Sequence, residues 1–230
     1  MKKISLIISF VVLFAFGGKA QSGDVRVGLK LGPSFDWAGS GSVQAENEGV
    51  RLGFNAGLVL DYYLTDHIAV SSGMNYNFFR MKYRFTDYRR TDDFLDETNV
   101  SVLRRLKAAN LEIPLKFKIK FGVAEAVDAY VEAGGCLGFN LKDYCKDEFS
   151  LYWTDYDGEV YEDCTSQYRA FQPSLVFGLG AEYEINRNLS AFVQLAFNHA
   201  VFNAFVSSLE KQTGSILRNN FIGVEVGLMH

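Results

Sequence analysis

The sequence has few of the residues that mark several classes of protein. Its 230 residues include only 3 Pro, 3 Cys and 3 His. So few prolines, beside 21 Gly and 48% hydrophobic residues, exclude a disordered tail and a collagen-like repeat. The net charge is −4, and no block of Lys or Arg accompanies a nucleic-acid motif, so we expect no nucleic-acid partner. The composition favours one folded domain.

One long apolar run lies at the N-terminus. Two lysines precede the run from Ile4 to Phe16, and Gly18-Lys19-Ala20 has the small-x-small pattern of a cleavage site. We therefore predict a cleaved signal peptide at residues 1–20 and a mature domain at residues 21–230. No Cys sits at the cleavage point, so no lipoprotein anchor is expected. The mature domain keeps 20 basic and 27 acidic residues, a net charge of −7.

No later segment approaches the roughly 20 apolar residues of a membrane helix. Instead, apolar and non-apolar residues alternate with the period of a β-strand, most clearly from Asn110 to Phe121. Eight segments alternate in this way, and each of the last four has about the 9 to 11 residues that a tilted strand needs to cross a bilayer. These segments are 25–31, 52–62, 68–78, 110–121, 129–141, 175–185, 189–201 and 222–230.

The connections between these segments alternate in length. Short connections lie near 65–66, 122–127 and 186–188. Long ones lie at 38–50, 86–109, 142–170 and 202–219. This arrangement is typical of short periplasmic turns and long extracellular loops. The sequence therefore predicts an all-β fold, an eight-stranded antiparallel up-and-down transmembrane β-barrel.

The third segment changes phase beyond Phe79. Arg80, Lys82 and Arg84 fall on the phase that was apolar, and Met81 takes the other phase. Either a β-bulge or the exit of the strand from the apolar layer explains this change.

The non-apolar face distinguishes a membrane barrel from a soluble one such as a lipocalin, whose apolar residues point inward. This face is rich in Gly and in charges of both signs, which suit a narrow lumen closed by ion pairs. We therefore expect the apolar face to meet lipid and the charged residues to form a lumen ion-pair network. Across the turn at 122–127, Lys118 or Lys120 should lie level with Glu132. The predicted network comprises Arg26, Lys30, Asp61, Glu112, Lys116, Lys118, Lys120, Glu132, Glu182, Glu184 and Glu225.

Three motifs resemble those of a known family. They are Val27-Gly28-Leu29-Lys30-Leu31-Gly32, Leu111-Glu112-Ile113-Pro114-Leu115-Lys116-Phe117-Lys118 and Phe177-Gly178-Leu179-Gly180-Ala181-Glu182-Tyr183. With them the mature chain resembles the small outer-membrane β-barrel proteins of the Bacteroidetes, often called porin-family or PorT-like proteins. The resemblance implies an eight-stranded barrel in the outer membrane of a Gram-negative bacterium. It offers no catalytic residues.

Three cysteines are an odd number for an exported protein. Cys145 and Cys164 share the third long loop, where a disulfide would contribute about 3 kcal/mol in the chain-entropy model. Asp157-Gly158 is a typical two-residue hairpin turn and would place Cys164 opposite Leu151 instead. Cys136 lies on the inward phase and is expected to be a small core residue.

No motif predicts catalysis, a metal or a cofactor. The three histidines, His67, His199 and His230, are scattered along the chain. Gly178-x-Gly180 lies within a strand and opens no helix, so we expect it to provide space in the lumen rather than to bind phosphate. In the third long loop, the acidic residues Asp155, Asp157 and Glu159 lack the spacing of a full calcium loop.

The aromatic residues fall into three groups. Two predicted interfacial girdles comprise Trp37, Phe78, Phe79, Phe139, Phe171 and Phe202 at the outer strand ends and Tyr62, Tyr63, Phe121, Tyr130 and Tyr183 at the inner ends. The third group lies in the third long loop and comprises Tyr152, Trp153, Tyr156 and Tyr161. This third group is a candidate contact surface for a glycan, protein or surface lipid, and packing within the loop is the alternative.

Three function classes remain. We favour a structural or surface-interaction barrel, because an eight-stranded lumen is just wide enough for side chains to fill. The alternatives are a narrow porin-like diffusion channel and a membrane-embedded lipid-modifying enzyme or secretion component. An enzyme would need a nucleophile and base at one rim, and the only outer-rim histidine is His199, so we expect no enzyme. The expected partners are outer-membrane lipid, the barrel-assembly machinery and an extracellular glycan or protein.

Overall fold

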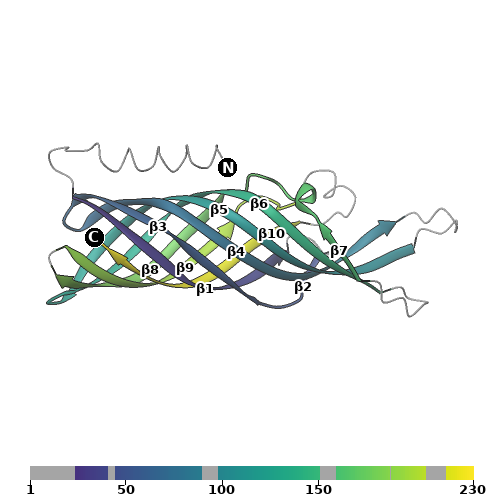
Figure 1. Cartoon of the computed structure of the whole chain (residues 1–230), viewed down its shortest axis with the longest axis horizontal. Helices are drawn as coiled ribbons and strands as arrows, with labels where there is room; N and C mark the ends of the chain where they lie inside the picture. Colours follow the sequence, from purple (N-terminus) through teal and green to yellow (C-terminus); the bar gives the residue numbers. More distant parts are fainter. Residues whose placement is uncertain (1–23, 41–44, 90–97, 151–158, 187, 206–215) are drawn as a thin grey trace.

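The computed structural model describes residues 24–40, 45–89, 98–150, 159–186, 188–205 and 216–230 (Figure 1). Among these residues only one short helix occurs, the 3-10 helix η1 (Thr165–Gln167), and no helix is long and apolar enough to cross a membrane. Eight long strands form the wall: β1 (Val25–Ser40), β3 (Arg51–Thr65), β4 (Ile68–Arg89), β5 (Thr98–Ala124), β6 (Val127–Ser150), β8 (Ser174–Asn186), β9 (Leu189–Ala200) and β10 (Leu217–Met229). The short strands β2 (Ala45–Asn47) and β7 (Glu159–Asp163) pair with β4 and β6.

The eight long strands close into a barrel. Each pairs antiparallel with the long strands before and after it in the chain. The first and last strands, β1 and β10, pair with Leu29 opposite Leu228. Because the sheet is closed, its membrane-spanning part has no edge strand with unpaired backbone N–H and C=O groups. A sheet in hydrocarbon requires this, because no water is present there to bind such groups. The predicted eight-stranded antiparallel barrel is confirmed.

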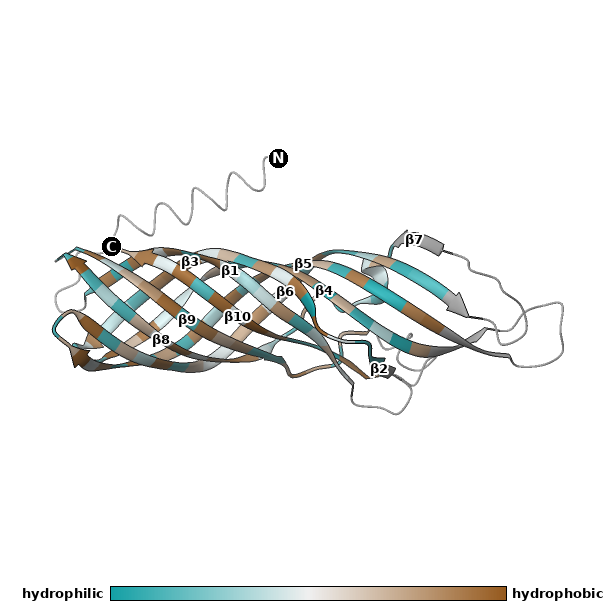
Figure 2. Ribbon diagram, turned by 90° about the horizontal axis from the view of Figure 1, so that it is seen from below, coloured by the Kyte–Doolittle hydropathy of each residue, from teal (hydrophilic) through white to brown (hydrophobic). Residues whose placement is uncertain are grey.

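Side chains alternate between the outside and the interior of this barrel. On β5, Leu115 and Phe117 are 63% and 64% exposed, whereas Lys116 and Lys118 are 5% and 3% exposed. Apolar residues therefore cover the outer wall, as predicted for contact with lipid. Hydrophobic and hydrophilic residues alternate along the barrel strands in Figure 2. We treat as membrane-spanning the parts that carry this apolar outer face: 25–37, 52–64, 68–79, 109–123, 129–141, 174–185, 189–200 and 220–229.

Three strands continue far beyond the spanning segments, at the end opposite the short turns. β4 continues to Arg89 and β5 starts at Thr98, so most of the predicted loop 86–109 is strand. β6 continues to Ser150, within the predicted loop 142–170. We call residues 80–89, 98–108 and 142–150, with β2 and β7, the extracellular extension. The loop predictions were wrong here because these strands have an apolar inner face instead of an apolar outer one.

β4 shows this inversion of polarity directly. Within the barrel its inward residues are polar, such as Asn75 and Asn77, and beyond them Phe79, Met81 and Tyr83 point inward and are buried. The register with β5 is unbroken from Asn75 to Arg89, so no bulge causes the change. Of the two explanations predicted from the sequence, exit from the apolar layer is the correct one.

A bulge occurs on β6 instead. Ala109 and Asn110 of β5 pair with Lys142 and Asn140, which leaves Leu141 as an extra residue. The inward positions of β6 therefore change parity at Leu141, so that Cys145 points inward in the extension. Nothing in the residue pattern predicted this bulge.

The girdle prediction is wrong for three aromatic residues. Phe79, Tyr63 and Tyr130 are 4%, 7% and 1% exposed and lie inside the barrel. Whether each of these side chains faces the lumen or the lipid depends on its place in the alternation along the strand, and not on its distance from the end of the strand. The phenol rings of Tyr63 and Tyr130 pack against cations of the lumen, which is a common role for aromatic faces.

Candidate functional site

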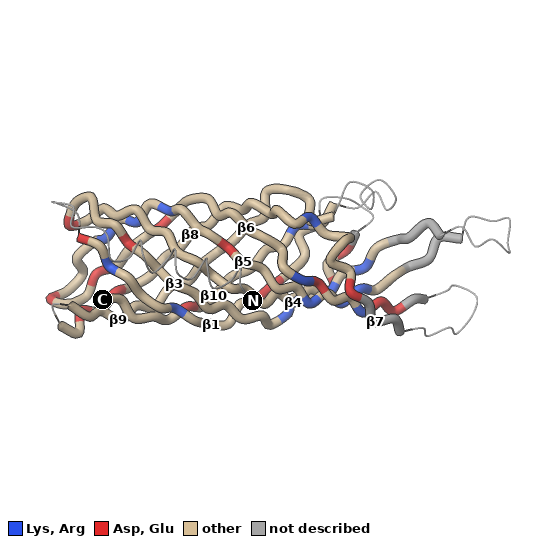
Figure 3. Tube along the Cα trace, turned by 45° about the horizontal axis from the view of Figure 1, so that its top comes forward, with Lys and Arg blue, Asp and Glu red and all other residues tan. Residues whose placement is uncertain are grey.

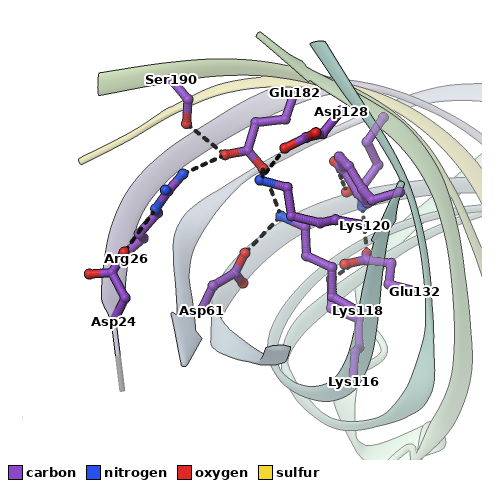
Figure 4. Close-up of polar contacts among 12 residues, drawn as sticks. Asp24, Arg26, Asp61, Lys116, Lys118, Lys120, Asp128, Glu132, Glu182 and Ser190 are labelled. Atoms are coloured by element: carbon purple, nitrogen blue, oxygen red, sulfur yellow. Dashed lines mark hydrogen bonds and ion pairs between the residues drawn. The ribbon is translucent and has the colours of Figure 1, made fainter. Parts of the chain in front are cut away.

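The barrel interior near the short turns holds an ion-pair network centred on Glu182 of β8 (Figure 4). Arg26 Nη1 lies 3.0 Å from Glu182 Oε1, and the Nζ atoms of Lys118 and Lys120 lie 3.3 and 3.4 Å from Oε2. Ser190 Oγ donates a hydrogen bond of 2.8 Å to Oε1. The side chain of Glu182 is fully buried, so these donors compensate a charge that would otherwise be costly to bury.

The two lysines bound by Glu182 have further partners. Lys118 Nζ lies 2.8 Å from Asp61 Oδ2 and 4.2 Å from the ring centre of Tyr130. Lys120 Nζ lies 2.8 Å from Asp128 Oδ2. Each cation therefore faces two carboxylates, which ties β5 to β3, β6 and β8 across the lumen.

A second group of polar side chains is buried beside the first. Lys116 pairs with Glu132, and Lys30 Nζ lies 2.8 Å from Glu225 Oε2. Gln194 Nε2 joins the two pairs, because it donates to Glu132 Oε1 at 2.9 Å and to Glu225 Oε2 at 3.2 Å. All five residues are at most 7% exposed. Together the two groups make one connected network from β1 to β10.

Nine of the eleven predicted network residues form these ion pairs. They are Arg26, Lys30, Asp61, Lys116, Lys118, Lys120, Glu132, Glu182 and Glu225. The prediction is wrong for Glu184, which is exposed at the rim beyond the end of the lumen. Glu112 is buried but meets no cation within 4.0 Å in the described part of the chain. It accepts hydrogen bonds from Cys136 Sγ at 3.7 Å and Asn198 Nδ2 at 3.4 Å instead.

The register predicted for Glu132 is confirmed, but its expected ion-pair partner is wrong. Lys118 lies opposite Glu132 in the register, yet Lys116 is its ion-pair partner. Long side chains reach diagonal neighbours across a strand pair, and Lys118 is held by Asp61 and Glu182. Asp128 and Gln194 were not among the predicted network residues. Both lie at inward-facing positions of their strands, so the alternation could have identified them.

Two glycines of β8 make room for the network. A Cβ on Gly178 would lie 2.5 Å from Cγ of Glu132, and one on Gly180 would lie 2.4 Å from Cζ of Tyr130. Such distances are too short for a larger residue without movement of the buried side chains. This agrees with the prediction that Gly178-x-Gly180 provides lumen space.

A polar layer of uncharged side chains lies in the lumen beyond the ion pairs. Several of their polar atoms, including both amide atoms of Asn55 and Nδ2 of Asn77, have no hydrogen-bond partner among the described residues. Such groups are suited to binding water. The buried asparagines of the layer are Asn55, Asn75, Asn77, Asn110, Asn198, Asn219 and Asn220. A cavity lined by network residues such as Lys30, Lys116 and Glu132 measures about 10 Å³, room for about one water.

An apolar cap fills the interior where the extension begins. Its largest members are Phe79, Met81, Tyr83, Phe85, Leu106, Tyr168, Phe205, Leu217 and Phe221. Phe205 and Tyr168 come from the segments that fold over this end, and their ring centres lie 5.5 Å apart. The Tyr83 and Tyr168 hydroxyls are hydrogen-bonded to each other. The interior is therefore occupied by charged, polar and apolar side chains in succession.

A disulfide joins Cys145 to Cys164 beside this cap. β6 and β7 place Cys145 opposite Glu162, so the expected register, with Cys164 opposite Leu151, is wrong. The Asp157-Gly158 turn itself lies outside the described residues. Both sulfurs are buried in the apolar cap, and Cys136 is a free, buried cysteine of the lumen.

A buried arginine crosses the extension near the disulfide. Arg104 makes two hydrogen bonds of 2.6 Å to Asp147 and one of 2.5 Å to Gln167, and its guanidinium lies 5.1 Å from the ring centre of Phe85. Burial alone would lower the pKa of Arg104, but its bonds to Asp147 raise it above the ordinary value. Burial also raises the pKa of Asp143 to about 6. The base of the extension therefore contains buried charged groups with hydrogen-bond partners, as the lumen does.

The described residues contain no group of three or more His, Cys, Asp or Glu that could hold a metal ion. His199 lies on the outer face, where its ring is stacked on Phe197 with the centres 6.3 Å apart. The acidic residues Asp155 and Asp157 fall outside the described residues. So do Tyr152, Trp153 and Tyr156 of the candidate contact surface, and of Tyr161 only its place on β7, opposite Lys146, is described.

Solved structures that match this chain include Neisserial surface protein A, with 12% identity, 91% of this chain and 98% of that chain covered, and a TM-score of 0.44. Another is the outer membrane protease OmpT from Escherichia coli, with 13% identity, coverage of 92% and 99%, and a TM-score of 0.40. A major outer membrane protein from Thermus thermophilus gives 10% identity, coverage of 90% and 99%, and a TM-score of 0.40. A search of curated proteins found no match.

The family model described as "Outer membrane protein beta-barrel domain" matches residues 19–206. This match covers more than half of the chain and agrees with the closed barrel and its apolar outer wall. The chain therefore belongs to the outer membrane protein beta-barrel domain family.

Proposed function

We propose that this outer-membrane protein is a structural or surface-interaction barrel that does not conduct solutes and that makes its contacts through the extracellular extension and loops. The filled interior carries this proposal. The ion-pair network, the polar layer and the apolar cap follow one another along the axis, and the cavity among the network residues measures about 10 Å³.

The plugged lumen can be tested by single-channel current. The refolded barrel would be placed in a planar bilayer beside the variant Lys116→Gln/Lys118→Gln/Lys120→Gln. A control variant, Lys82→Gln/Arg84→Gln/Arg105→Gln, removes the same charge from outside the lumen. We expect no reproducible steps from the folded wild type. Steps whose ion selectivity changes in the lumen variant alone would establish the alternative, a narrow diffusion channel, and overturn the proposal.

The contacts are proposed to involve the third long loop. Trp153 and Tyr156 belong to the candidate contact surface predicted for an extracellular glycan or protein. A glycan array would be probed with the barrel in nanodiscs, using Trp153→Ala/Tyr156→Ala and, as control, Tyr183→Ala at the opposite end. Wild type and control should bind a common glycan class that the loop variant loses. No binding, or equal binding by all three proteins, would overturn a glycan-binding role for this loop.

We propose no enzymatic activity and no cofactor. His199, the outer-rim histidine that an enzyme hypothesis would use, stacks on Phe197 at the outer face. Unchanged lipid or peptide turnover by a His199→Ala protein would exclude His199, the only residue nominated for such chemistry. The sequence motifs support two further parts of the proposal, membership of the Bacteroidetes PorT-like group and cleavage of residues 1–20. Recognition by the barrel-assembly machinery is also proposed, because the chain is an outer-membrane barrel.

A further inference from the structure

Cations cluster on β4, β5 and β6 immediately beyond the lipid-facing residues of these strands (Figure 3). We call this cluster the basic band. Alternation along the three strands places all of its members on the outer side of the sheet. The basic band comprises Arg80, Lys82, Arg84, Arg105, Lys107, Lys142 and Lys146.

The strand register brings like charges together within this band. Arg80 lies directly opposite Lys107, and Lys82 lies directly opposite Arg105. Like charges at directly opposed positions destabilise a strand pair. A sheet that repeats such pairs at its surface is stabilised by an anion placed between them.

Carboxylates of the chain compensate only the part of the band farther from the membrane. Glu48 lies 2.8 Å from Arg84, and Glu148 lies 2.9 Å from Arg105 and 3.9 Å from Lys146.

The row of cations nearest the membrane has no such partner. In the described parts of the chain, no carboxylate lies within 4.0 Å of the side-chain nitrogens of Arg80, Lys107 or Lys142. The buried Asp36 accepts the backbone N–H of Arg80, at 2.9 Å, rather than its guanidinium. Lys142 Nζ lies 4.7 Å from the ring centre of Tyr144, so it has an aromatic neighbour but no carboxylate partner among the described residues. The inner row is therefore the part of the band whose charge is least compensated and most available to an external anion.

A groove connects this inner row to the lipid-facing wall. It measures about 750 Å³, within the range of small-molecule sites, and its rim includes Arg80, Lys107 and Lys142. Its apolar lining includes Leu52, Phe54, Tyr76 and Phe78, which are 57%, 44%, 38% and 50% exposed. One depression thus offers an apolar surface at the height of the acyl chains and three cations at the height of the headgroups.

The spacing of the cations indicates the size of the anion. The inner row lies on three neighbouring strands, so its ends are about 10 Å apart. This is a spacing of backbone positions. A headgroup with two phosphates can place one near each end of such a row and contact all three cations at once. The apolar groove below the row excludes a purely water-soluble polyanion as the best match.

We propose that this groove binds a bisphosphorylated glycolipid of the outer leaflet, with its phosphates on Arg80, Lys107 and Lys142 and an acyl chain along Phe54 and Phe78. The phosphate oxygens accept charge-assisted hydrogen bonds from the three cations. The acyl chain fills the apolar groove at the outer wall of β3 and β4. The site is independent of the lumen and of the third long loop, so it goes beyond the proposed function.

The test measures binding of a fluorescent bisphosphorylated lipid A to the refolded full-length barrel in phosphatidylcholine nanodiscs. The groove variant is Arg80→Gln/Lys107→Gln/Lys142→Gln. The matched control, Arg84→Gln/Arg105→Gln/Lys146→Gln, removes the same charge from the outer part of the band. Because each cation near an anionic lipid surface contributes roughly 1 kcal/mol, we expect affinity to fall about 100-fold in the groove variant. In the control it should change by less than about fivefold, since those cations have carboxylate neighbours.

Three further probes, tested in the same binding assay, distinguish the chemical class of the ligand. Phosphatidylglycerol, with one phosphate, should bind at least about tenfold more weakly than lipid A. The deacylated bisphosphorylated disaccharide should also bind more weakly, because it cannot use the groove. Equal loss of affinity in both variants, or equal binding of the acylated and deacylated probes, would overturn the proposal. Binding of a sulfated polysaccharide in preference to lipid A would reassign the site to a glycan. All the changed side chains are exposed except that of Lys146, which is partly buried, and the heat-dependent electrophoretic shift of a folded barrel verifies that both variants are intact.

Discussion

Lys116 of β5 pairs with Glu132 of β6, although the residue directly opposite Glu132 in the register is Lys118. The diagonal pair forms because Lys118 is held between Asp61 and Glu182. The choice of partner within the ion-pair network therefore depends on the whole network rather than on one strand pair.

We predict that Lys116→Met destabilises the barrel by about 3 kcal/mol, because Glu132 then remains buried without its cation. The double variant Lys116→Met/Glu132→Leu should recover most of this loss, since it buries no unpaired charge. Urea unfolding in phospholipid vesicles, followed by tryptophan fluorescence, gives the free energies. Additive losses in the double variant would show that the pair is not coupled.

Glu182 and Glu184 provide a matched comparison on one strand. Glu182→Gln removes the charge that faces Arg26, Lys118 and Lys120, so we expect a loss of about 3 kcal/mol. Glu184→Gln changes an exposed rim residue and should stay within about 0.5 kcal/mol of wild type. The same unfolding measurement applies. Similar losses in the two variants would contradict a central role for Glu182.

The sequence predicted the barrel because lipid imposes one simple rule on each spanning strand. Apolar residues such as Leu115 and Phe117 face outward, and the intervening lysines face inward. The same parity found nine of the eleven network residues. It could not choose between Lys116 and Lys118 as the partner of Glu132, because parity assigns a side chain to a face and not to a neighbour.

The extension was missed because the rule reverses outside the membrane. On β4, the inward residues change from Asn77 to Phe79 and Met81 where the strand leaves the apolar layer. On β6, the extra residue Leu141 shifts the parity as well. When one phase of alternation is assumed for the whole strand, the residues beyond the membrane do not fit it. These strand ends are therefore predicted to be loops. The apolar cap depends on such long-range pairing and could not be predicted locally.

The disulfide gives a prediction about local stability. Cys145 and Cys164 are separated by 19 positions, and their bond holds the segment of η1 against β6. Cys145→Ser/Cys164→Ser should lower the free energy of local unfolding around η1 by about 3 kcal/mol, measured by hydrogen exchange of the Tyr168 N–H. The control Cys136→Ala should leave that exchange unchanged.

Thiol titration checks the bonding itself. The unfolded wild type should show one free thiol without reductant, that of Cys136, and three after reduction. Three free thiols before reduction would contradict the disulfide.

Asp143 gives a pH prediction for the extension. Burial raises its pKa from 3.8 to about 6, although a hydrogen bond from Asn140 opposes the rise. Between these values the folded protein binds more protons than the unfolded chain, so stability falls as pH rises. The contribution is fully present below about pH 4 and is lost above about pH 6, and it amounts to at most about 3 kcal/mol.

Hydrogen exchange of the Cys164 N–H reports this change directly, because that group donates to the Asp143 carbonyl oxygen at 3.1 Å. After correction for intrinsic exchange rates, protection in the wild type should be greater at pH 4 than at pH 7. Asp143→Asn cannot ionise, so its protection should be the same at both values. A pH dependence of equal size in the variant would assign the effect to another group, and greater protection of the wild type at pH 7 would reverse the sign that burial of this carboxyl requires.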